Sequence, residues 1–305
     1  MAGLFQVFFW LSRDNLVTLN ENSFEKIESL SYSPFEGYDK NLLSSEQIAY
    51  DVNLFENFTN KLRTYGTLEA YKILQSSKDS NLPIDLGLWI GGDLEANNLE
   101  IQRALEILKE YPNRIQSVIV GNEVLLRKEL EPLELYAYID FMKSHTKKPV
   151  TTAETWDIWE KNPQLASHVD FLTIHILPYW EKVPIERYNE FIIEKYSVVE
   201  ELFPNRKIVI GETGWPSHGY NNNSAIPSIK NQAQAIRGFV NLAHEKGWHY
   251  NIIEALDQPW KGYDEGNVGQ YWGIFTTDRA LKFQLAGEVE LNKYWLYQMI
   301  AAIII

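Results

Sequence analysis

The sequence contains no cysteine, which excludes disulfides and thiolate metal sites but does not decide the compartment. Basic residues are also few. The chain has 28 Lys and Arg but 41 Asp and Glu, so its net charge is −13 with histidine neutral. Such a chain is a poor partner for a phosphate backbone, and a neutral ligand fits it better. We therefore expect no nucleic-acid partner.

Long hydrophobic runs are missing too. The apolar segments at 4–11 and 296–305 are shorter than the ~20 residues that a membrane span requires. The first also lacks the charged start and the cleavage site of a secretory signal. We interpret the C-terminal run as the start of a span and the N-terminal run as the tail of another. An ordinary buried end segment is the alternative.

This interpretation divides the chain into an N-terminal segment 1–28, a folded domain 29–290 and a C-terminal segment 291–305. It predicts an extracytoplasmic, periplasmic domain that is attached to a membrane in the full-length protein. Neither the compartment nor the oligomeric state follows from composition alone.

What the sequence does contain is a regular alternation of short apolar runs and longer helical patterns. One helix is expected to begin after Ser44, a good N-cap, and another near Pro132. The apolar runs predict eight strands, at 29–35, 62–66, 84–90, 118–123, 149–153, 169–176, 207–212 and 250–256.

Eight strands that alternate with helices, with no Gly/Ser linker and no change of composition, indicate an α/β fold. We predict a closed (β/α)8 TIM barrel of one domain. A doubly wound open sheet is the alternative, but no Gly-x-Gly-x-x-Gly follows the first strand.

Two of the predicted strands end in the same way. Each is a β-branched run that passes through a glycine to a glutamate, Glu123 in one strand and Glu212 in the other. In a closed barrel the carboxyl ends of all strands open on one face, so we expect the two carboxylates to meet there. Glu123 could instead satisfy amide donors at a helix start, and Glu212 could be a salt-bridged barrel residue.

Aromatic and polar residues collect just after the strands. Ten Trp, 17 Tyr and 14 Phe are more than core filling explains. Aromatic faces around a mouth with carboxylates suit sugar rings, whose C–H faces are apolar and whose hydroxyls need partners. Each aromatic alone could be a core residue, but their recurrence favours a sugar site. The candidates are Tyr32, Phe35, Tyr65, Trp89, Asn122, Glu154, Trp156, His175, Tyr179, Trp215 and Trp260.

Two motifs resemble glycoside hydrolase family 17, the β-1,3-glucanase and glucanosyltransferase family of a retaining (β/α)8 clan. They are Val-Gly-Asn-Glu-Val at 120–124 and Gly-Glu-Thr-Gly-Trp-Pro-Ser at 211–217. Supporting pieces lie at 31–35, 62–66, 173–179, 257–261 and 271–275, and the resemblance covers about residues 29–285.

The resemblance implies roles for individual residues. Glu123 would be the general acid/base and Glu212 the nucleophile that forms a glycosyl-enzyme. Asn122 would bind the sugar 2-hydroxyl, and Tyr179 would orient Glu212. Sugar contacts would come from Trp215, Trp260, Gln258 and Lys261. The family often has a glutamate near the position of Gln258, so the role of that carboxylate is in doubt, although Lys261 and Glu265 could assist.

The resemblance implies no cofactor and no metal. The six histidines contain no His-x-x-x-His pair, and only His175 is expected in the mouth. The implied ligand is β-1,3-glucan or laminari-oligosaccharides.

Several details, including Ser-Tyr-Ser-Pro-Phe at 31–35, are similar to the bacterial, membrane-attached branch of the family. That likeness favours a β-1,3-glucanosyltransferase (transglycosylase) working beside a membrane glucan synthase domain. An endo-β-1,3-glucanase (hydrolase) is the alternative, and a non-catalytic glucan-binding barrel is a more remote one.

Overall fold

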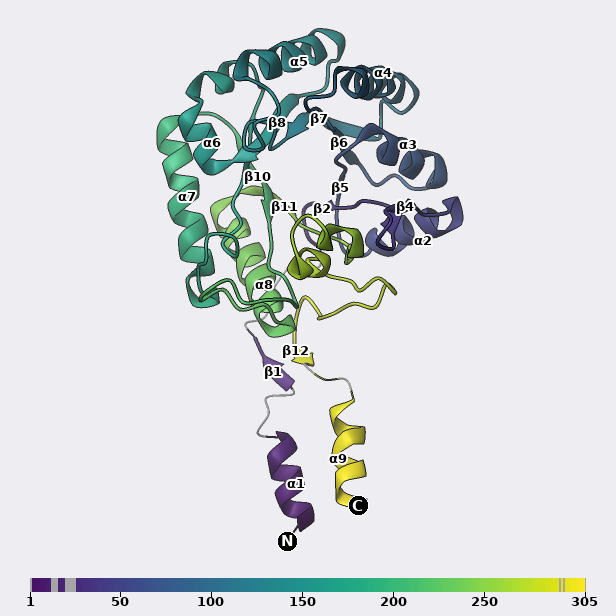
Figure 1. Ribbon diagram of the computed structural model, residues 1–305, viewed down its shortest axis with the longest axis vertical. Helices are drawn as coiled ribbons and strands as arrows, with labels where there is room; N and C mark the ends of the chain where they lie inside the picture. Colours follow the sequence, from purple (N-terminus) through teal and green to yellow (C-terminus); the bar gives the residue numbers. More distant parts are fainter. Residues whose placement is uncertain (1, 12–15, 20–25, 291, 293, 305) are drawn as a thin grey trace.

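The computed structural model describes residues 2–11, 16–19, 26–290, 292 and 294–304. Eight parallel strands close into a barrel in the order β10-β11-β2-β5-β6-β7-β8-β9, which confirms the predicted (β/α)8 fold (Figure 1). The strands are β2 Leu30–Ser31, β5 Leu62–Arg63, β6 Ile84–Leu88, β7 Ile115–Asn122, β8 Val150–Thr155, β9 Leu172–His175, β10 Ile208–Thr213 and β11 His249–Ile252.

The first and eighth strands are shorter than the sequence predicts. The expected strand 29–35 ends at Ser31, because the chain turns at Pro34, where the Phe35 amide donates to the Ser33 carbonyl. Phe35–Glu36 then forms β3, which pairs antiparallel with β4, Asn41–Leu42. The expected strand 250–256 ends at Ile252. Beyond it the backbone still donates to Thr213 and Ser31, at Ile253 and Ala255, but it also bonds to residues 272–275.

Helices surround the barrel (Figure 1), and both predicted helix starts are confirmed. The hydroxyl of Ser44 accepts from the amide of Gln47, and Pro132 occupies the first turn of its helix. The barrel helices are α2 Ser45–Phe55, α3 Thr67–Ser76, α4 Leu94–Glu110, α5 Pro132–His145, α6 Trp156–Lys161, α7 Tyr188–Leu202 and α8 Ile229–Lys246. Short 3-10 turns lie at η1 Pro163–Ser167, η2 Ile185–Arg187, η3 Pro259–Gly262 and η4 Asn267–Tyr271.

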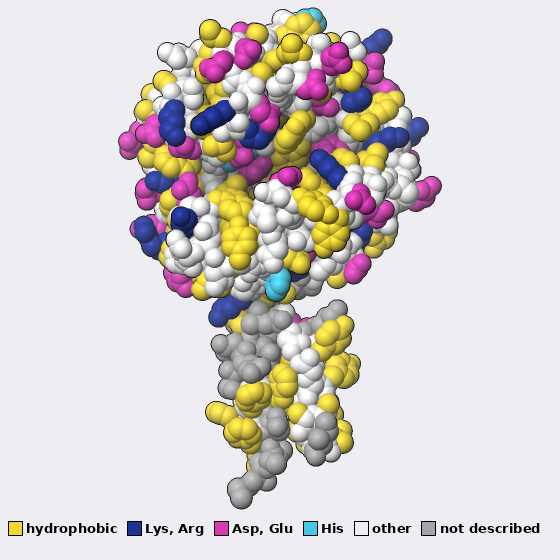
Figure 2. All heavy atoms as spheres, viewed as in Figure 1, with side chains coloured by type: hydrophobic (Ala, Val, Ile, Leu, Met, Phe, Trp, Pro, Cys, Tyr) yellow, Lys and Arg dark blue, Asp and Glu magenta, His cyan; other side chains and the backbone are white. Residues whose placement is uncertain are grey.

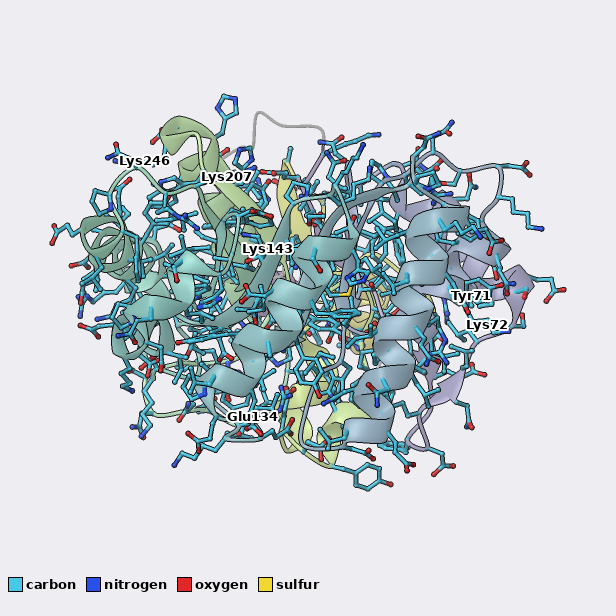
Figure 3. The ribbon with its side chains drawn as sticks, turned by 90° about the horizontal axis from the view of Figure 1, so that it is seen from above. Tyr71, Lys72, Glu134, Lys143, Lys207 and Lys246 are labelled. Carbon is cyan, nitrogen blue, oxygen red and sulfur yellow. The ribbon has the colours of Figure 1, made fainter. Side chains whose placement is uncertain are left out.

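The helices run antiparallel to the strands, as they must when each one leads back to the start of the next strand. Figure 3 shows Glu134, in the first turn of α5, at one end of the barrel and Lys207, which precedes β10, at the other. The loops that follow the strands therefore share the end that carries Glu134. This is the end where the predicted site should lie.

The two ends of the chain meet in a stalk beside the barrel (Figure 1). β1, Leu16–Thr18, pairs antiparallel with β12, Glu288–Glu290. Beyond this ribbon α1, Ala2–Leu11, and α9, Trp295–Ile304, lie side by side. Among the described residues, no helix combines the length and the apolar character that crossing a membrane requires. Parts of the expected end segments, at 1, 12–15, 20–25, 291, 293 and 305, lie outside the described residues.

Candidate active site

Glu123 and Glu212 meet on one face of the barrel. Glu123 follows the last residue of β7, and Glu212 lies near the end of β10. One oxygen of each carboxylate and one ring nitrogen of His175 all lie within 4.8 Å of one another. A separation of about 5 Å is typical of retaining glycosidases, in which no water has to fit between the two carboxyl groups.

The local backbone geometry requires a glycine shortly before each of these glutamates. Gly121 has a φ of 83°, and a Cβ there would lie 2.5 Å from a methyl group of Val124. The next turn puts Glu123 itself in the left-handed region, with a φ of 54°. At Gly211 a Cβ would collide with Thr173. Because glycine has no side chain, the Arg63 guanidinium can approach this residue and donate to its carbonyl at 2.5 Å.

Glu212 is held by a phenol and a guanidinium. The hydroxyl of Tyr65 donates to its Oε1 at 2.9 Å, and Nη1 of Arg63 lies 3.5 Å from the same oxygen. Only 7% of the Glu212 side chain is exposed. Nη2 of Arg63 also donates to Oδ1 of Asn122 at 2.6 Å. Two donors from one short stretch of chain, Arg63 in β5 and Tyr65 just after it, thus hold the Glu212 carboxylate in place.

Arg63 was not among the predicted site residues, although its signal is present in the sequence. It directly follows Leu62 in the second barrel strand, where a charged side chain has no packing use. Its side chain is 2% exposed, so the charge must find partners inside the barrel.

Glu123 is paired with His175. Nδ1 of His175 lies 2.7 Å from Oε1 of Glu123, whose side chain is 22% exposed. Burial raises the pKa of Glu123, but the hydrogen bond and charge of His175, with the charges of Arg127 and Arg63, outweigh burial and lower it. The hydrogen bond between His175 and Glu123 is therefore the largest of the influences that lower the pKa of this carboxyl group.

Two further buried glutamates, Glu154 and Glu254, bind residues near this site. Glu154 accepts hydrogen bonds from the amides of Leu125 and Leu126, at 2.7 and 3.3 Å, and so holds the turn after Glu123. Burial raises its pKa to about 7. Glu154 is fully buried, so its expected contact with substrate is replaced by a contact with this turn.

The other buried glutamate, Glu254, was not predicted. It follows β11, accepts from Nζ of Lys261 at 2.8 Å, and has its pKa raised to about 7 by burial. A carboxylate is thus present just after the eighth strand, four residues before Gln258. An acidic residue within the apolar run 250–256 was the available signal.

The cleft has two halves that share Glu123, Glu212, Ile253 and Glu265. Figure 2 looks onto this face of the barrel, which is hollowed at its centre. The larger half has a volume of about 500 Å³, the smaller one of about 220 Å³. The larger half is lined by Tyr65, Trp89, Asn122, Trp260 and Lys261 among others, and the smaller half by Trp156, His175, Trp180 and Trp272 among others.

Eight of the candidate residues beyond the two glutamates line this cleft: Phe35, Tyr65, Trp89, Asn122, Trp156, His175, Trp260 and Lys261. The tryptophans Trp180 and Trp272 were not predicted, although each lies in a segment that supported the family resemblance or follows it directly. Their rings stack with centroids 5.9 Å apart.

Besides Glu154, four predicted residues are buried and line neither half of the cleft. The hydroxyl of Tyr32 donates to Asp51 at 2.9 Å. The indole of Trp215 donates to the Ile226 carbonyl at 3.0 Å. Gln258 accepts from the indole of Trp260 at 2.6 Å, so it positions that ring rather than a sugar.

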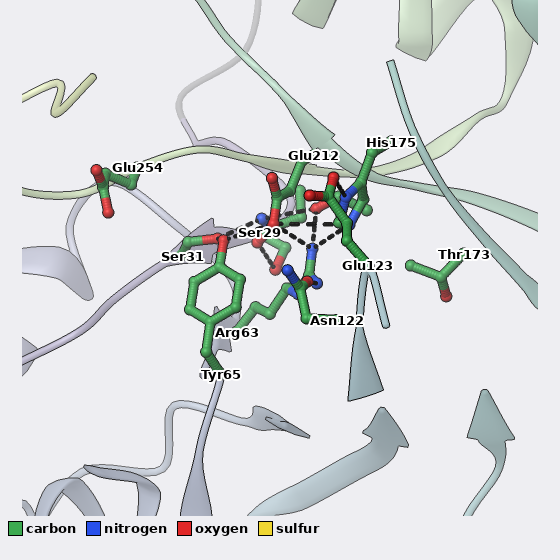
Figure 4. A network of polar contacts seen from close by, with 12 residues as sticks. Ser29, Ser31, Arg63, Tyr65, Asn122, Glu123, Thr173, His175, Glu212 and Glu254 are labelled. Atoms are coloured by element: carbon green, nitrogen blue, oxygen red, sulfur yellow. Dashed lines mark hydrogen bonds and ion pairs between the residues drawn. The ribbon is translucent and has the colours of Figure 1, made fainter. Parts of the chain in front are cut away.

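Tyr179 is the fourth buried residue, and its expected contact with Glu212 is not formed. Its hydroxyl donates to the carbonyl of Tyr220 at 2.6 Å. The donor to Glu212 is Tyr65 instead, whose hydroxyl points toward the Glu212 carboxylate (Figure 4).

Glu123, His175 and Glu212 are also the group of described residues that could hold a metal ion. A guanidinium stands beside them, however. Nη1 of Arg63 lies 3.3 Å from Nε2 of His175 and 3.5 Å from Glu212. Its fixed positive charge opposes a second cation, so the cluster suits proton transfer and nucleophilic attack better.

Comparisons with known proteins find a family model and several relatives that match this chain. The family model described as BtgE/BtgC glycoside hydrolase domain matches residues 29–273. A glucan 1,3-beta-glucosidase of Schizosaccharomyces pombe is 27% identical over 255 residues, which cover 77% of this chain and 79% of that protein. A putative glucan endo-1,3-beta-glucosidase, btgC of Aspergillus niger, is 28% identical, and the match covers 78% of this chain but only 40% of that protein.

Solved structures include two similar barrels. A beta-1,3-glucanosyltransferase of Rhizomucor miehei, also solved as an active-site mutant with laminaritriose, matches with a TM-score of 0.76 and 25% identity over 84% of this chain and 95% of that chain. An endo-laminarinase from Formosa Hel1_33_131 matches with a TM-score of 0.73 over 86% of each chain. At 20% identity, the second likeness is one of fold alone.

Proposed function

This chain belongs to the BtgE/BtgC group of glycoside hydrolase family 17, and from that premise we propose that it is a retaining β-1,3-glucanosyltransferase. Membership makes it a glycoside hydrolase or transglycosylase that acts on β-1,3-glucan. The pair Glu123 and Glu212, within 4.8 Å in a cleft that continues on both sides of them, supports the retaining mechanism, and the aromatic lining of one half of the cleft supports transfer.

In the first step a Glu212 oxygen attacks the anomeric carbon of the donor. The bond to the glycosidic oxygen breaks, and Glu123 gives that oxygen its proton. The result is a glycosyl-enzyme ester and a shortened leaving glucan. In the second step an acceptor hydroxyl gives its proton to Glu123 and attacks the same carbon from the opposite face. Glu212 leaves as a carboxylate, and two inversions retain the configuration.

Asn122 is assigned to the sugar that becomes attached to Glu212. Its Oδ1 already accepts from Arg63, so its Nδ2 is left to donate into the cleft. A donor at this point suits the 2-hydroxyl oxygen, whose hydrogen bonds strengthen as the transition state develops. Because Asn122 and Tyr65 line the larger half, we assign that half to the donor chain.

The smaller half then holds the leaving group and, later, the acceptor. Its lining by Trp156, Trp180 and Trp272 supports transfer over hydrolysis, because aromatic faces bind a sugar and displace water. An endo-β-1,3-glucanase is the second candidate. A barrel that only binds glucan is less suitable, since it gains nothing from a second carboxylate beside the first.

Product analysis tests this proposal. The protein is incubated with one laminari-oligosaccharide of defined length, and the products are resolved by mass and by linkage. Products longer than the donor are expected. Only shorter products would establish hydrolysis, and binding without turnover would leave the glucan-binding barrel. The linkage of the new bond is read from the same sample.

We also propose that the stalk attaches the barrel to a lipid surface. α1 and α9 contain no charged residue, and several of their large apolar side chains are exposed, with Phe8 71% and Tyr297 72% exposed. Figure 2 shows hydrophobic side chains on the stalk surface. A helix without a polar face is suited to an apolar medium rather than to water.

The order of side chains along the stalk favours lipid over a protein partner. Trp10 and Trp295 lie at the barrel ends of their helices, whereas Leu4, Ile303 and Ile304 lie nearer the tip, where both chain ends are found. Aromatic residues at the level of the headgroups and aliphatic residues beyond them are typical of membrane contact. An extracytoplasmic site beside a glucan synthase domain remains a prediction from the family resemblance.

Flotation with liposomes tests the stalk. The full chain should rise with vesicles of phosphatidylcholine and phosphatidylglycerol, and Leu4→Ser with Ile304→Ser should leave it at the bottom of the gradient. The matched control, Leu68→Ser on the exposed barrel surface, should float like the unaltered chain. Flotation that does not change with the stalk substitutions would overturn the proposal.

A further inference from the structure

A chain of buried polar side chains leads from the barrel interior to Glu212 (Figure 4). Ser31 lies in β2 and Asn251 in β11, and the two side chains are 0% and 3% exposed. Nδ2 of Asn251 lies 2.7 Å from Oγ of Ser31, which lies 3.0 Å from the hydroxyl of Tyr65. That hydroxyl in turn lies 2.9 Å from Oε1 of Glu212.

The orientation of the Asn251 amide follows from its neighbours. Nδ2 lies 3.0 Å from the carbonyl oxygen of Gly211, which can only accept a hydrogen bond. Oδ1 lies 2.7 Å from the hydroxyl of Ser29, which can donate. The nitrogen therefore faces Gly211 and Ser31, and Asn251 donates to both.

This orientation sets the direction of every later hydrogen bond. Because Oγ of Ser31 accepts from Asn251, its own proton is free to point to Tyr65. The Tyr65 oxygen accepts that proton and turns its own toward Glu212. If Tyr65 donated to Ser31 instead, a phenol lone pair would face a carboxylate oxygen at 2.9 Å. The three donors Asn251, Ser31 and Tyr65 therefore all point along the chain toward the Glu212 carboxylate.

We propose that Asn251 and Ser31 are positioning residues that keep Tyr65 oriented as a hydrogen-bond donor to Glu212. Neither residue lines the cleft, so both act through Tyr65. Asn251 acts twice, because it also holds the carbonyl of Gly211, the residue before Glu212. Hydrogen bonds arranged in one direction polarise each other, so the last bond of the chain, from Tyr65 to Glu212, is strengthened.

The inference rests on the proposed role of Glu212 as nucleophile, and its test requires enzymes that remain active. Ser31→Ala should lower kcat roughly 2- to 10-fold, as expected for the loss of one buried hydrogen bond, and should leave KM unchanged. Tyr65→Phe should lower kcat roughly 10- to 100-fold, because its bond goes to a charged group. Active sites are counted by trapping the glycosyl-enzyme with a 2-fluoro donor, and each kcat is calculated per active site.

A double variant separates positioning from general damage to the fold. If Ser31 acts only through Tyr65, Ser31→Ala should have no further effect on kcat in the Tyr65→Phe background. The same fold-reduction in both backgrounds would overturn the proposal. Failure of the proposed function would be seen in a different variant, because Glu212→Gln would then retain turnover. The Ser31 and Tyr65 variants could still be compared in that case.

Ser117→Ala is the matched control. The Ser117 hydroxyl is also buried in a barrel strand and donates to Asp85 at 2.6 Å, but it has no link to Glu212. It should lose stability without losing kcat. Asn251→Asp provides an isosteric second variant, because a carboxylate cannot donate to Ser31. Its kcat should fall at least as far as that of Ser31→Ala, and an unchanged kcat would contradict the proposed direction of the chain.

Discussion

Nδ1 of His175 lies 2.7 Å from Oε1 of Glu123, and Nε2 of the same ring lies 3.6 Å from Oε1 of Glu212. One imidazole therefore contacts both proposed catalytic carboxylates. It contacts the proposed acid/base more closely, so its main effect is expected on proton transfer rather than on nucleophilic attack.

Replacing His175 should change the pH dependence of the reaction. Burial raises the pKa of Glu123, and the His175 bond and charge lower it below its usual value. His175→Gln removes the larger lowering influence, so the pKa of Glu123 should rise. The acid then keeps its proton to higher pH, and the basic limb of the kcat/KM profile should move upward.

The control for this shift is a donor with a dinitrophenyl leaving group, which needs no proton from the enzyme. With this donor His175→Gln should leave the basic limb where it is in the unaltered chain. An unmoved limb with a natural laminari-oligosaccharide would mean that His175 does not govern Glu123.

The two carboxylates should be distinguishable by azide rescue. Glu212→Ala should abolish turnover, and azide should then replace the nucleophile and yield an α-glycosyl azide from an activated β-donor. Glu123→Ala should lower the rate with natural donors by about 10²–10⁴-fold, as expected for lost acid–base catalysis. With azide it should give the β-product, because the glycosyl-enzyme still forms. Product configuration by NMR decides, and exchanged outcomes would reverse the two roles.

Trp156 should favour acceptor sugar over water. It lines the smaller half of the cleft, so Trp156→Ala should lower the ratio of transfer to hydrolysis several-fold and change donor cleavage little. Trp89 is the matched control, since it lines the larger half. Trp89→Ala should raise KM for the donor and leave the ratio unchanged. Equal effects of both variants on the ratio would argue against separate donor and acceptor halves.

Glu69 should make stability depend on pH. Its Oε1 accepts from the amides of Tyr65 and Gly66, and burial raises its pKa to about 7. The folded state therefore holds the proton more tightly than the unfolded chain, whose glutamates titrate near ~4.3. The stabilisation from this proton is complete below that value and is lost as the pH rises toward about 7.

Glu69→Gln keeps an oxygen for both amides and removes the titration. The unfolding free energy of this variant should exceed that of the unaltered chain at pH ~7.5, by up to about 3 kcal/mol, and match it near pH ~4. Urea unfolding at the two pH values measures the difference. A difference that is the same at both pH values would show that ionisation of Glu69 is not its cause.

The sequence by itself determined the barrel and its two glutamates. Alternation of apolar runs and helical patterns is a local property, and closure of the sheet then brings all carboxyl ends of the strands to one face. Glu123 and Glu212 could be paired without coordinates for this reason. The same logic selected Trp89, Trp156 and Trp260, which follow their strands and line the cleft.

Only the tertiary structure decided which way each side chain turns. Side chains alternate across a strand, and a shift of register by one residue reverses them. Such shifts occur next to both glutamates, between Ile119 and Asn122 in β7 and between Ile210 and Glu212 in β10. Strand position alone therefore could not tell that Tyr179 and Trp215 face the core while Tyr65 faces Glu212. Arg63 and Asn251 likewise became part of the site through partners far away in the sequence, which no local pattern encodes.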